Sequence, residues 1–378
     1  MISSLVTTSQ QLYIGCISGT SIDGLDIALV KFEGNKIHTV QTDCIKLPEQ
    51  LGHALSQLCD SNSDEELERF GRVDHELGKF IGKSTNDFLT RLNINPQSVT
   101  AIGSHGQTIR HRPEGPTPFS IQIGNGHAIA EHSGIMTIND FRMADMVCGG
   151  QGAPLVPAFH EAIFSSEDAH HFIINLGGIS NISVIPQGHI HNSYGYDIGP
   201  ANTLLDRWIE FHKDKNYDEN GTWASSGEVI TSLLKRLYND PFFSAPAPKS
   251  TGREYFNLQW LNQHEIQDLK PEDVQRTLLE LSAVSVAETI KAEKQNLVGP
   301  VKFYVCGGGA HNQLLIERIE TLTNEHIQFT DELGIPVDDV EACAFAWLAK
   351  QTTERKAGNL ISATGASRPK ILGAIHLS

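Results

Sequence analysis

The sequence has no apolar stretch that approaches the roughly 20 residues needed to span a bilayer, and no basic segment leads into a long apolar run at its N-terminus. Positive charge is also scarce, because 29 Lys and Arg stand against 45 Asp and Glu, a formal net charge of -16. No basic stripe with interleaved aromatic residues offsets this charge, which would repel a phosphate backbone. We therefore expect a cytoplasmic protein with no membrane or nucleic-acid partner.

Paired cysteines are missing as well. The six cysteines are scattered without a CxxC pair, which predicts reduced and mostly buried thiols. The 17 histidines include no HExxH motif. Pairs such as His170 with His171, and His189 with His191, lie in segments that look polar, so we expect solvated side chains rather than metal ligands.

What is present is the composition of a folded protein. The 378 residues are 39% hydrophobic and 20% charged, and this length favours two domains. Apolar residues at helical spacing predict long helices over residues 65–89 and 274–291, whose natural role is to cover sheets. We expect an α/β protein whose chain crosses into its second domain near residue 137. The glycine-rich segment 121–157 fits either a backbone close to a ligand or an ordered structural loop.

One strand–turn–strand pattern occurs twice. Residues 12–32 and 172–185 each read as two apolar strands joined by a turn of small residues. The turns contain residues 18–21 in the first pattern and residues 175–178 in the second. Two such hairpins, far apart in the sequence, predict two similar domains that face one another.

A third glycine-rich element follows the strand predicted over residues 302–306. Residues 307–309 are all glycine, and the helix predicted from about 312 to 323 comes next. Each glycine-rich turn alone is often only a turn. Three in this order favour a phosphate site, because backbone N–H groups at such tips can point at phosphate oxygens.

Carboxylates beside these turns are the candidates for acid–base work. Asp23 and Asp26 follow the first tip, and Asp23 fits either an Asx turn or a magnesium role through water. Asp197 precedes a Gly-Pro break and a predicted helix, so we expect it to project into a cleft, with turn capping as the alternative. Asp338 and Glu341 have the spacing of a capping box at the start of a helix predicted over residues 340–350, which leaves a structural role open for Glu341.

Motifs across nearly the whole chain carry a resemblance to a known family. In chain order they occupy residues 15–26, 104–108, 149–157, 175–181, 197–202, 307–309 and 341–342. With them the chain resembles the anhydro-N-acetylmuramic acid kinases, within the actin and hexokinase superfamily. The departure is Cys16-Ile17, where a methionine is expected before Ser-Gly-Thr; an apolar strand position should tolerate it.

The resemblance implies two actin-like (ribonuclease H-like) α/β domains, with ATP and sugar in the cleft between them. Residues 1–137 with about 355–378 would form the first domain, and 138–354 the second. Asp197 would be the catalytic base, and Asp23 would hold Mg²⁺ weakly through water. Nucleotide contacts would come from Gly19, Thr20, Ser21, Ile22, Asp23, Gly24, Leu25, Asp26, Asn175, Gly177, Gly178, Gly307, Gly308 and Gly309. Sugar contacts would come from His105, Gln107, Arg142, Asp145, Gln151 and Glu341.

The implied reaction needs water as well as ATP. In a 1,6-anhydro sugar O6 is tied to C1, so no free hydroxyl is present to deprotonate. Asp197 would take a proton from water attacking C1 while O6 acquires the γ-phosphoryl group, giving N-acetylmuramic acid 6-phosphate in a homodimeric enzyme. Either Arg142 or a backbone nest would meet the lactyl carboxylate of the substrate.

Three other functions stay open at this stage. The levoglucosan kinases share these motifs and act on a simpler anhydro sugar. A glycoside hydrolase would also use carboxylates in a cleft but gives no reason for three phosphate-type turns. A non-catalytic ATP-binding module could share the fold, since fold alone does not fix function.

Overall fold

The computed structural model describes residues 11–19, 22, 24–34, 36–59, 65–188, 192–247, 249–253 and 255–378. The chain forms two compact units, Met1–Phe159 with Glu341–Ser378, and His160–Val340. These boundaries differ from those expected near residues 137 and 354. Segment 138–159 stays with the first unit because strand β6 (Thr137–Asn139) pairs inside the first sheet, between β4 and β12.

The sheet of the first unit has the order β12-β6-β4-β1-β2-β3, with β5 paired to β4. The strands are β1 (Gln11–Ser18), β2 (Gly24–Glu33), β3 (Lys36–Lys46), β4 (Val99–Arg112), β5 (Phe119–Ile123), β6 and β12 (Ala374–His376). β1, β2 and β3 form an antiparallel meander, and β1 pairs with β4 in parallel. The first predicted hairpin is therefore confirmed.

The sheet of the second unit repeats this topology. Its strands are β7 (His170–Leu176), β8 (Ile179–Ile185), β9 (Tyr194–Pro200), β10 (Val301–Cys306) and β11 (Ile327–Phe329). They have the order β11-β10-β7-β8-β9, with an antiparallel β7-β8-β9 meander and parallel β7–β10 and β10–β11 pairs. This order matches β6-β4-β1-β2-β3 of the first sheet, which carries β5 and β12 in addition, and the match confirms the predicted pair of similar α/β domains and their ribonuclease H-like topology.

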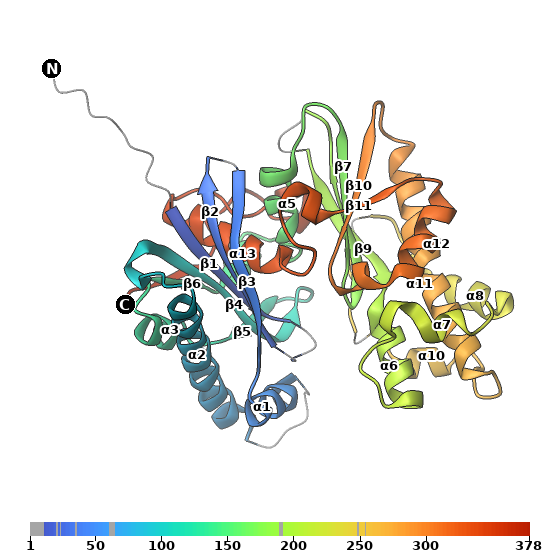
Figure 1. The fold of residues 1–378 in the computed structure, drawn as a ribbon, viewed down its shortest axis with the longest axis horizontal. Coiled ribbons are helices and arrows are strands. Elements are labelled where there is room, and N and C mark those ends of the chain that lie inside the picture. Colours follow the sequence, from blue (N-terminus) through green and yellow to red (C-terminus); the bar gives the residue numbers. More distant parts are fainter. Residues whose placement is uncertain are drawn as a thin grey trace. The chain divides into compact units, whose positions relative to one another are not determined.

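Helices cover both faces of the first sheet. Alternation along β1 turns Ile14 and Cys16 toward a core that includes α1 (Glu49–Cys59) and α2 (Glu66–Arg91). On the opposite face Gly15 meets α13 (Val340–Thr353), which is drawn red beside the blue strands in Figure 1. The C-terminal part of the chain thus completes the first unit.

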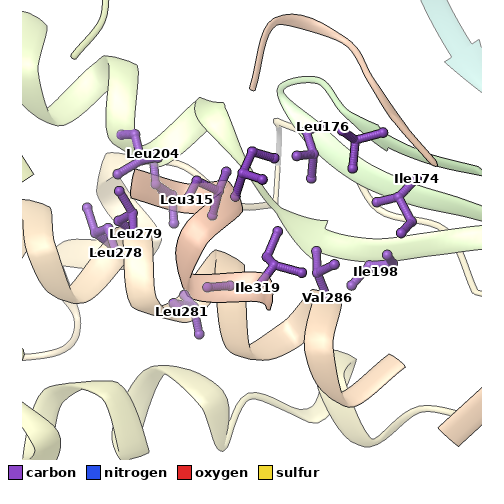
Figure 2. Close-up of a cluster of buried hydrophobic side chains, with 14 of the residues drawn as sticks. Ile174, Leu176, Ile198, Leu204, Leu278, Leu279, Leu281, Val286, Leu315 and Ile319 are labelled. Atoms are coloured by element: carbon purple, nitrogen blue, oxygen red, sulfur yellow. The ribbon is translucent and has the colours of Figure 1, made fainter. Parts of the chain in front are cut away.

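The core of the second unit lies between its sheet and three helices. Side chains of α6 (Asn202–Lys213), α11 (Pro271–Lys294) and α12 (Gln313–Thr323) meet side chains from β7 and β9 (Figure 2). The helices predicted over 65–89, 274–291 and 312–323 are confirmed as α2, α11 and α12. Their apolar periodicity matches the faces that they bury.

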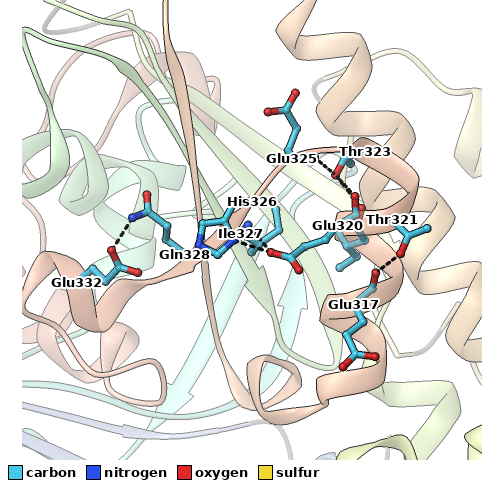
Figure 3. Close-up of polar contacts among 10 residues, drawn as sticks. Glu317, Glu320, Thr321, Thr323, Glu325, His326, Ile327, Gln328 and Glu332 are labelled. Carbon is cyan, nitrogen blue, oxygen red and sulfur yellow. Dashed lines mark hydrogen bonds and ion pairs between the residues drawn. The ribbon is translucent and has the colours of Figure 1, made fainter.

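Short helices complete both units. They are α3 (Gly126–Ser133), α4 (Phe141–Met146), α5 (Val156–Phe164), α7 (Thr222–Ser225), α8 (Thr231–Tyr238), α9 (Pro241–Ser244), α10 (Leu258–Asn262) and α14 (Ile361–Thr364). Figure 3 shows how α12 is joined to β11: the Glu320 carboxylate accepts hydrogen bonds from His326 Nδ1 (2.8 Å) and Ile327 N (2.9 Å). In the described ranges no helix is long and apolar enough to cross a membrane.

The structure confirms the prediction for the cysteines and corrects the one for two histidines. None of the six cysteines forms a disulfide bond within the described ranges, and four of them are buried, as predicted. The prediction of solvated rings is wrong for His170 and His171, which are buried in β7. His170 Nε2 contacts the carbonyl oxygen of Val298, a long-range partner that local polarity does not reveal. His189 and His191 lie outside the described residues.

Candidate active site

In the second unit two predicted nucleotide elements meet at one edge of the sheet. β7 and β10 run parallel, and Asn175 lies opposite Cys306 where both strands end. Gly307 has a φ of +81°, and a Cβ atom there would lie 2.2 Å from Asn175 Oδ1. Only glycine fits such a close approach in this backbone conformation. The loop 307–309 is therefore packed against the end of the hairpin, whereas a Cβ atom placed on Gly308 would meet no described residue within 4 Å beyond its own chain neighbours.

The tip of the β7–β8 hairpin is fastened to the start of α6. The carbonyl oxygen of Gly177 accepts from Asn202 N, and that of Gly178 accepts from Thr203 N, both at 3.0 Å. Asn202 Nδ2 donates to the carbonyl oxygen of Leu176 at 2.9 Å. The two backbone bonds use the first N–H groups of α6, so the helix contributes the partial positive charge of its dipole behind the tip rather than free donors.

Asp197 lies within β9 and is half-buried. One of its carboxylate oxygens, Oδ2, accepts hydrogen bonds from Ser250 Oγ and Thr251 N, both at 2.9 Å. Its backbone N donates to the carbonyl oxygen of Lys249. The carboxylate is therefore fixed by a segment about 50 positions away, which a strand-by-strand interpretation of the sequence missed. The only signal was a run of small polar residues after Lys249.

The tip of the first hairpin is described only in part. Thr20, Ser21 and Asp23 lie outside the described residues, so their predicted nucleotide and metal contacts stay predictions. The carbonyl oxygen of Gly19 accepts a hydrogen bond from Ile22 N at 3.2 Å, and Ile22 has a φ of +57°.

The end of the first hairpin is tied to the next strands by packing and one hydrogen bond. The Leu25 side chain is in the core, and a Cβ atom on Gly24 would lie 2.6 Å from Cys44 Sγ. The Ser18 hydroxyl donates to Gln107 Oε1 at 2.8 Å, which joins β1 to β4. The Gln107 side chain is buried in the first unit.

The buried His105 and the partly buried Arg142 form a polar pair in the first unit. Arg142 Nε donates to His105 Nε2 at 3.0 Å, and Arg142 Nη1 donates to the carbonyl oxygen of Gly152 at 2.8 Å. Burial, and after it the Arg142 charge, hold the pKa of His105 well below its ordinary value. The ring is neutral at pH 7, so it accepts from Arg142 and orients the guanidinium.

Asp145 is fully buried and holds two loops together. Its Oδ2 accepts from Gly152 N at 2.9 Å, while Oδ1 accepts from Asn359 Nδ2 and Thr364 Oγ1. A Cβ atom on Gly150 would lie 2.1 Å from Asp145 Oδ2. These contacts make Asp145 a support of the loop that carries the exposed Gln151.

Glu341 begins the helical stretch that packs against β1. Crowding by protein atoms raises the pKa of the Glu341 carboxyl, and the Asp26 charge raises it further, whereas the Arg142 charge lowers it. Part of the Glu341 side chain nevertheless remains exposed. Asp338 contacts the His311 ring instead, with 2.8 Å between Oδ2 and Nε2. In the described part of the chain no group of three or more His, Cys, Asp or Glu side chains is arranged to hold a metal ion.

The chain is similar to one family over almost its full length. The family described as anhydro-N-acetylmuramic acid kinase matches residues 11–378. A relative from Actinobacillus pleuropneumoniae serotype 7 (strain AP76), named anhydro-N-acetylmuramic acid kinase, is 46% identical over 375 residues, covering 97% of this chain and 99% of its own length. A Coxiella burnetii (strain Dugway 5J108-111) protein of the same name is 44% identical over 369 residues, covering 97% and 98%.

Solved structures are more distant. The activator of 2-hydroxyisocaproyl-CoA dehydratase from Clostridium difficile with bound ADPNP covers 91% of this chain and 98% of its own, at 12% identity and a TM-score of 0.42. A likeness of that size has no bearing on function here.

Proposed function

The chain belongs to the anhydro-N-acetylmuramic acid kinase family, and from this premise we propose that it uses ATP and water to convert 1,6-anhydro-N-acetylmuramic acid into N-acetylmuramic acid 6-phosphate and ADP. The observation that carries the proposal is the Asp197 carboxylate, fixed on β9 in the same unit as the β7–β8 tip and the loop 307–309. A base and phosphate-type turns on one sheet suit a reaction that couples water attack to phosphoryl transfer.

Asp197 acts as the general base in this reaction. It accepts a proton from the water that forms the new bond to C1, the C1–O6 bond breaks, and O6 bonds to the γ-phosphoryl group as ADP leaves. Ser250 Oγ and Thr251 N keep one carboxylate oxygen in place, so the acceptor geometry is set before substrate arrives. General-base assistance of this kind contributes roughly 10²- to 10⁴-fold.

The first unit supplies the sugar contacts in this proposal. Arg142 donates a hydrogen bond to His105 of the motif 104–108, and we assign to its guanidinium the lactyl carboxylate of the substrate. His105 and Gly152 hold two of its N–H groups, and Asp145 holds Gly152. These contacts orient the Arg142 guanidinium before the ligand binds.

Mg²⁺ is the ion that such phosphoryl transfer requires, and it neutralises charge on the phosphates. Asp26 and Glu341 fit the role of holding it, because the Asp26 charge raises the pKa of the Glu341 carboxyl and Mg²⁺ is commonly held by one or two carboxylates plus waters and phosphates. Asp23 remains a weaker candidate, through water. A cytoplasmic location, expected from the sequence, and a homodimer, implied by the resemblance, are also part of the proposal.

The test is turnover of three sugars: 1,6-anhydro-N-acetylmuramic acid, levoglucosan and N-acetylmuramic acid, each with and without Mg-ATP, with ADP and sugar phosphate measured. We expect phosphorylation of the first sugar, little turnover of the other two, and no ring opening without ATP. Equal turnover of levoglucosan would overturn the substrate assignment, and ring opening without ATP would identify a hydrolase.

A further inference from the structure

One short segment touches both the proposed base and the tip of the β7–β8 hairpin. Residues 249–251 contact Asp197 through its backbone N and its Oδ2 atom. Two residues later, the Arg253 side chain lies on the bare Cα of Gly178. The segment therefore spans the distance between the group that takes the proton and the turn assigned to phosphate.

Two polar side chains converge on Gly178. A Cβ atom placed there would lie 3.0 Å from both Nε and Nη2 of Arg253, and 2.7 Å from Thr203 Oγ1. The glycine is what allows this approach. Thr203 is only 6% exposed, and its hydroxyl has no hydrogen-bond partner within the described ranges. A buried hydroxyl is rarely left unpaired in a native protein, so this one points to an atom supplied by a ligand.

The charges around this cluster suit an anion. Thr203 stands in the first turn of α6, a helix of 12 residues. The neighbouring Asp206 carboxyl has its pKa raised to about 7, chiefly by burial, against the opposing charge of Arg253. A guanidinium fork and a hydroxyl are donors that bind phosphoryl oxygens, and the dipole of α6 adds partial positive charge beside them.

We propose that Arg253 and Thr203 donate hydrogen bonds to the transferred phosphoryl group, and that residues 249–251 position Asp197, so that one segment aligns the base with the group being transferred. The assignment rests on the proposed function for the identity of the sugar. It makes Arg253 a further catalytic residue and Ser250 a positioning residue.

The direct test compares binding of ADP with binding of ADP plus aluminium fluoride, an analogue of the transferring phosphoryl group, both with Mg²⁺. Arg253→Ala is expected to weaken the analogue complex about 10²- to 10³-fold while ADP binding changes less than about threefold. Arg253→Lys should recover part of the loss, because it keeps the charge but not the fork. The matched control is Arg207→Ala, an exposed arginine on α6 paired with Glu210.

Two further variants guard against a folding defect. Thr203→Val keeps the shape and should lower kcat about tenfold with an unchanged or raised melting temperature, since it removes an unpaired buried hydroxyl. Ser250→Ala should lower kcat about tenfold with KM and analogue binding unchanged, and Ser250→Thr should restore part of it, because one hydrogen bond to the base is lost and regained.

The outcomes separate the two proposals. If Arg253→Ala binds the analogue as well as Arg207→Ala does, or loses ADP and analogue affinity equally, the assignment of Arg253 to the transferred phosphoryl group is overturned. If the native protein does not phosphorylate the anhydro sugar, the proposed function fails, while the analogue measurement still decides the role of Arg253.

Discussion

Single residues in the first unit illustrate how neighbours decide chemical roles. His105 Nε2 accepts from Arg142, so the ring proton resides on Nδ1, which lies 3.1 Å from the carbonyl oxygen of Gly106 and donates to it. A histidine held neutral with both nitrogens occupied does not serve as a proton shuttle. The motif 104–108 marked His105 in the sequence, but its role depends on Arg142, which no local spacing links to it.

The Asp206 carboxyl makes the stability of the protein depend on pH. Its folded-state pKa of about 7 lies above the ordinary value near 3.9, so ionising it costs stability as pH rises from about 4 to 7. Burial is the main cause; Arg253 and Arg207 oppose the shift, and Glu210 and Asp218 add to it. Asp206→Asn should therefore be more stable than the native protein at pH 8, by on the order of 3 kcal/mol, with the gain shrinking toward pH 5.

Urea unfolding at pH 5, 6.5 and 8 measures this effect. Asp268→Asn, a change of an exposed carboxylate in the same unit, serves as the control. A gain for Asp206→Asn that is as large at pH 5 as at pH 8 would contradict the buried-carboxyl explanation.

At the scale of elements, helix α13 rests directly on the first sheet because two strands carry glycine. A Cβ atom on Gly103 would lie 2.0 Å from the carbonyl oxygen of Phe345, and one on Gly15 would lie 1.7 Å from that of Ala342. Backbone cannot move aside as a flexible side chain can. Gly103→Ala should thus lower the free energy of unfolding by about 3 kcal/mol.

For Gly71 we expect the opposite change in stability when alanine replaces glycine. Gly71 is exposed inside α2, and a Cβ atom placed there would meet no described residue within 4 Å apart from the adjacent backbone of α2. Gly71→Ala should stabilise the protein by about 0.5–1 kcal/mol, because glycine is a poor helix former. Thermal unfolding of both variants measures the contrast, and equal effects would argue against direct packing of α13 on β4.

The elements themselves were largely predictable from the sequence. Apolar periodicity located α2, α11 and α12, and alternation with small-residue turns located both hairpins, since these signals are local. The support of Asp197 by Ser250 and Thr251 was not predictable, because it depends on contacts between distant segments. The unit boundary near residue 159 was missed for the same reason: β6 belongs to the first sheet through pairing, not through its own sequence.

At the scale of the whole molecule, the chain leaves its first unit and returns to it. Helix α13 covers β1 and β4, and β12 pairs with β6, so residues 341–378 complete the first unit. The second unit, His160–Val340, is continuous and has its own core. A fragment of residues 160–340 should therefore fold cooperatively, whereas residues 1–159 alone should not.

Circular dichroism and urea titration of the two fragments check this expectation. The matched control for the first unit is a chain in which a flexible linker joins residues 1–159 to residues 341–378, and it should recover cooperative unfolding. Cooperative unfolding of residues 1–159 alone would show that the returning segment is dispensable.

The measurement that most directly tests the central claim is turnover of 1,6-anhydro-N-acetylmuramic acid with Mg-ATP in ¹⁸O-labelled water, for the native protein and Asp197→Asn. The account predicts the label at C1, phosphate on O6, and a loss of about 10²- to 10⁴-fold in kcat for Asp197→Asn, which keeps the shape of the side chain but cannot accept the proton. Product without label at C1, or an Asp197→Asn variant as active as the native protein, would contradict it.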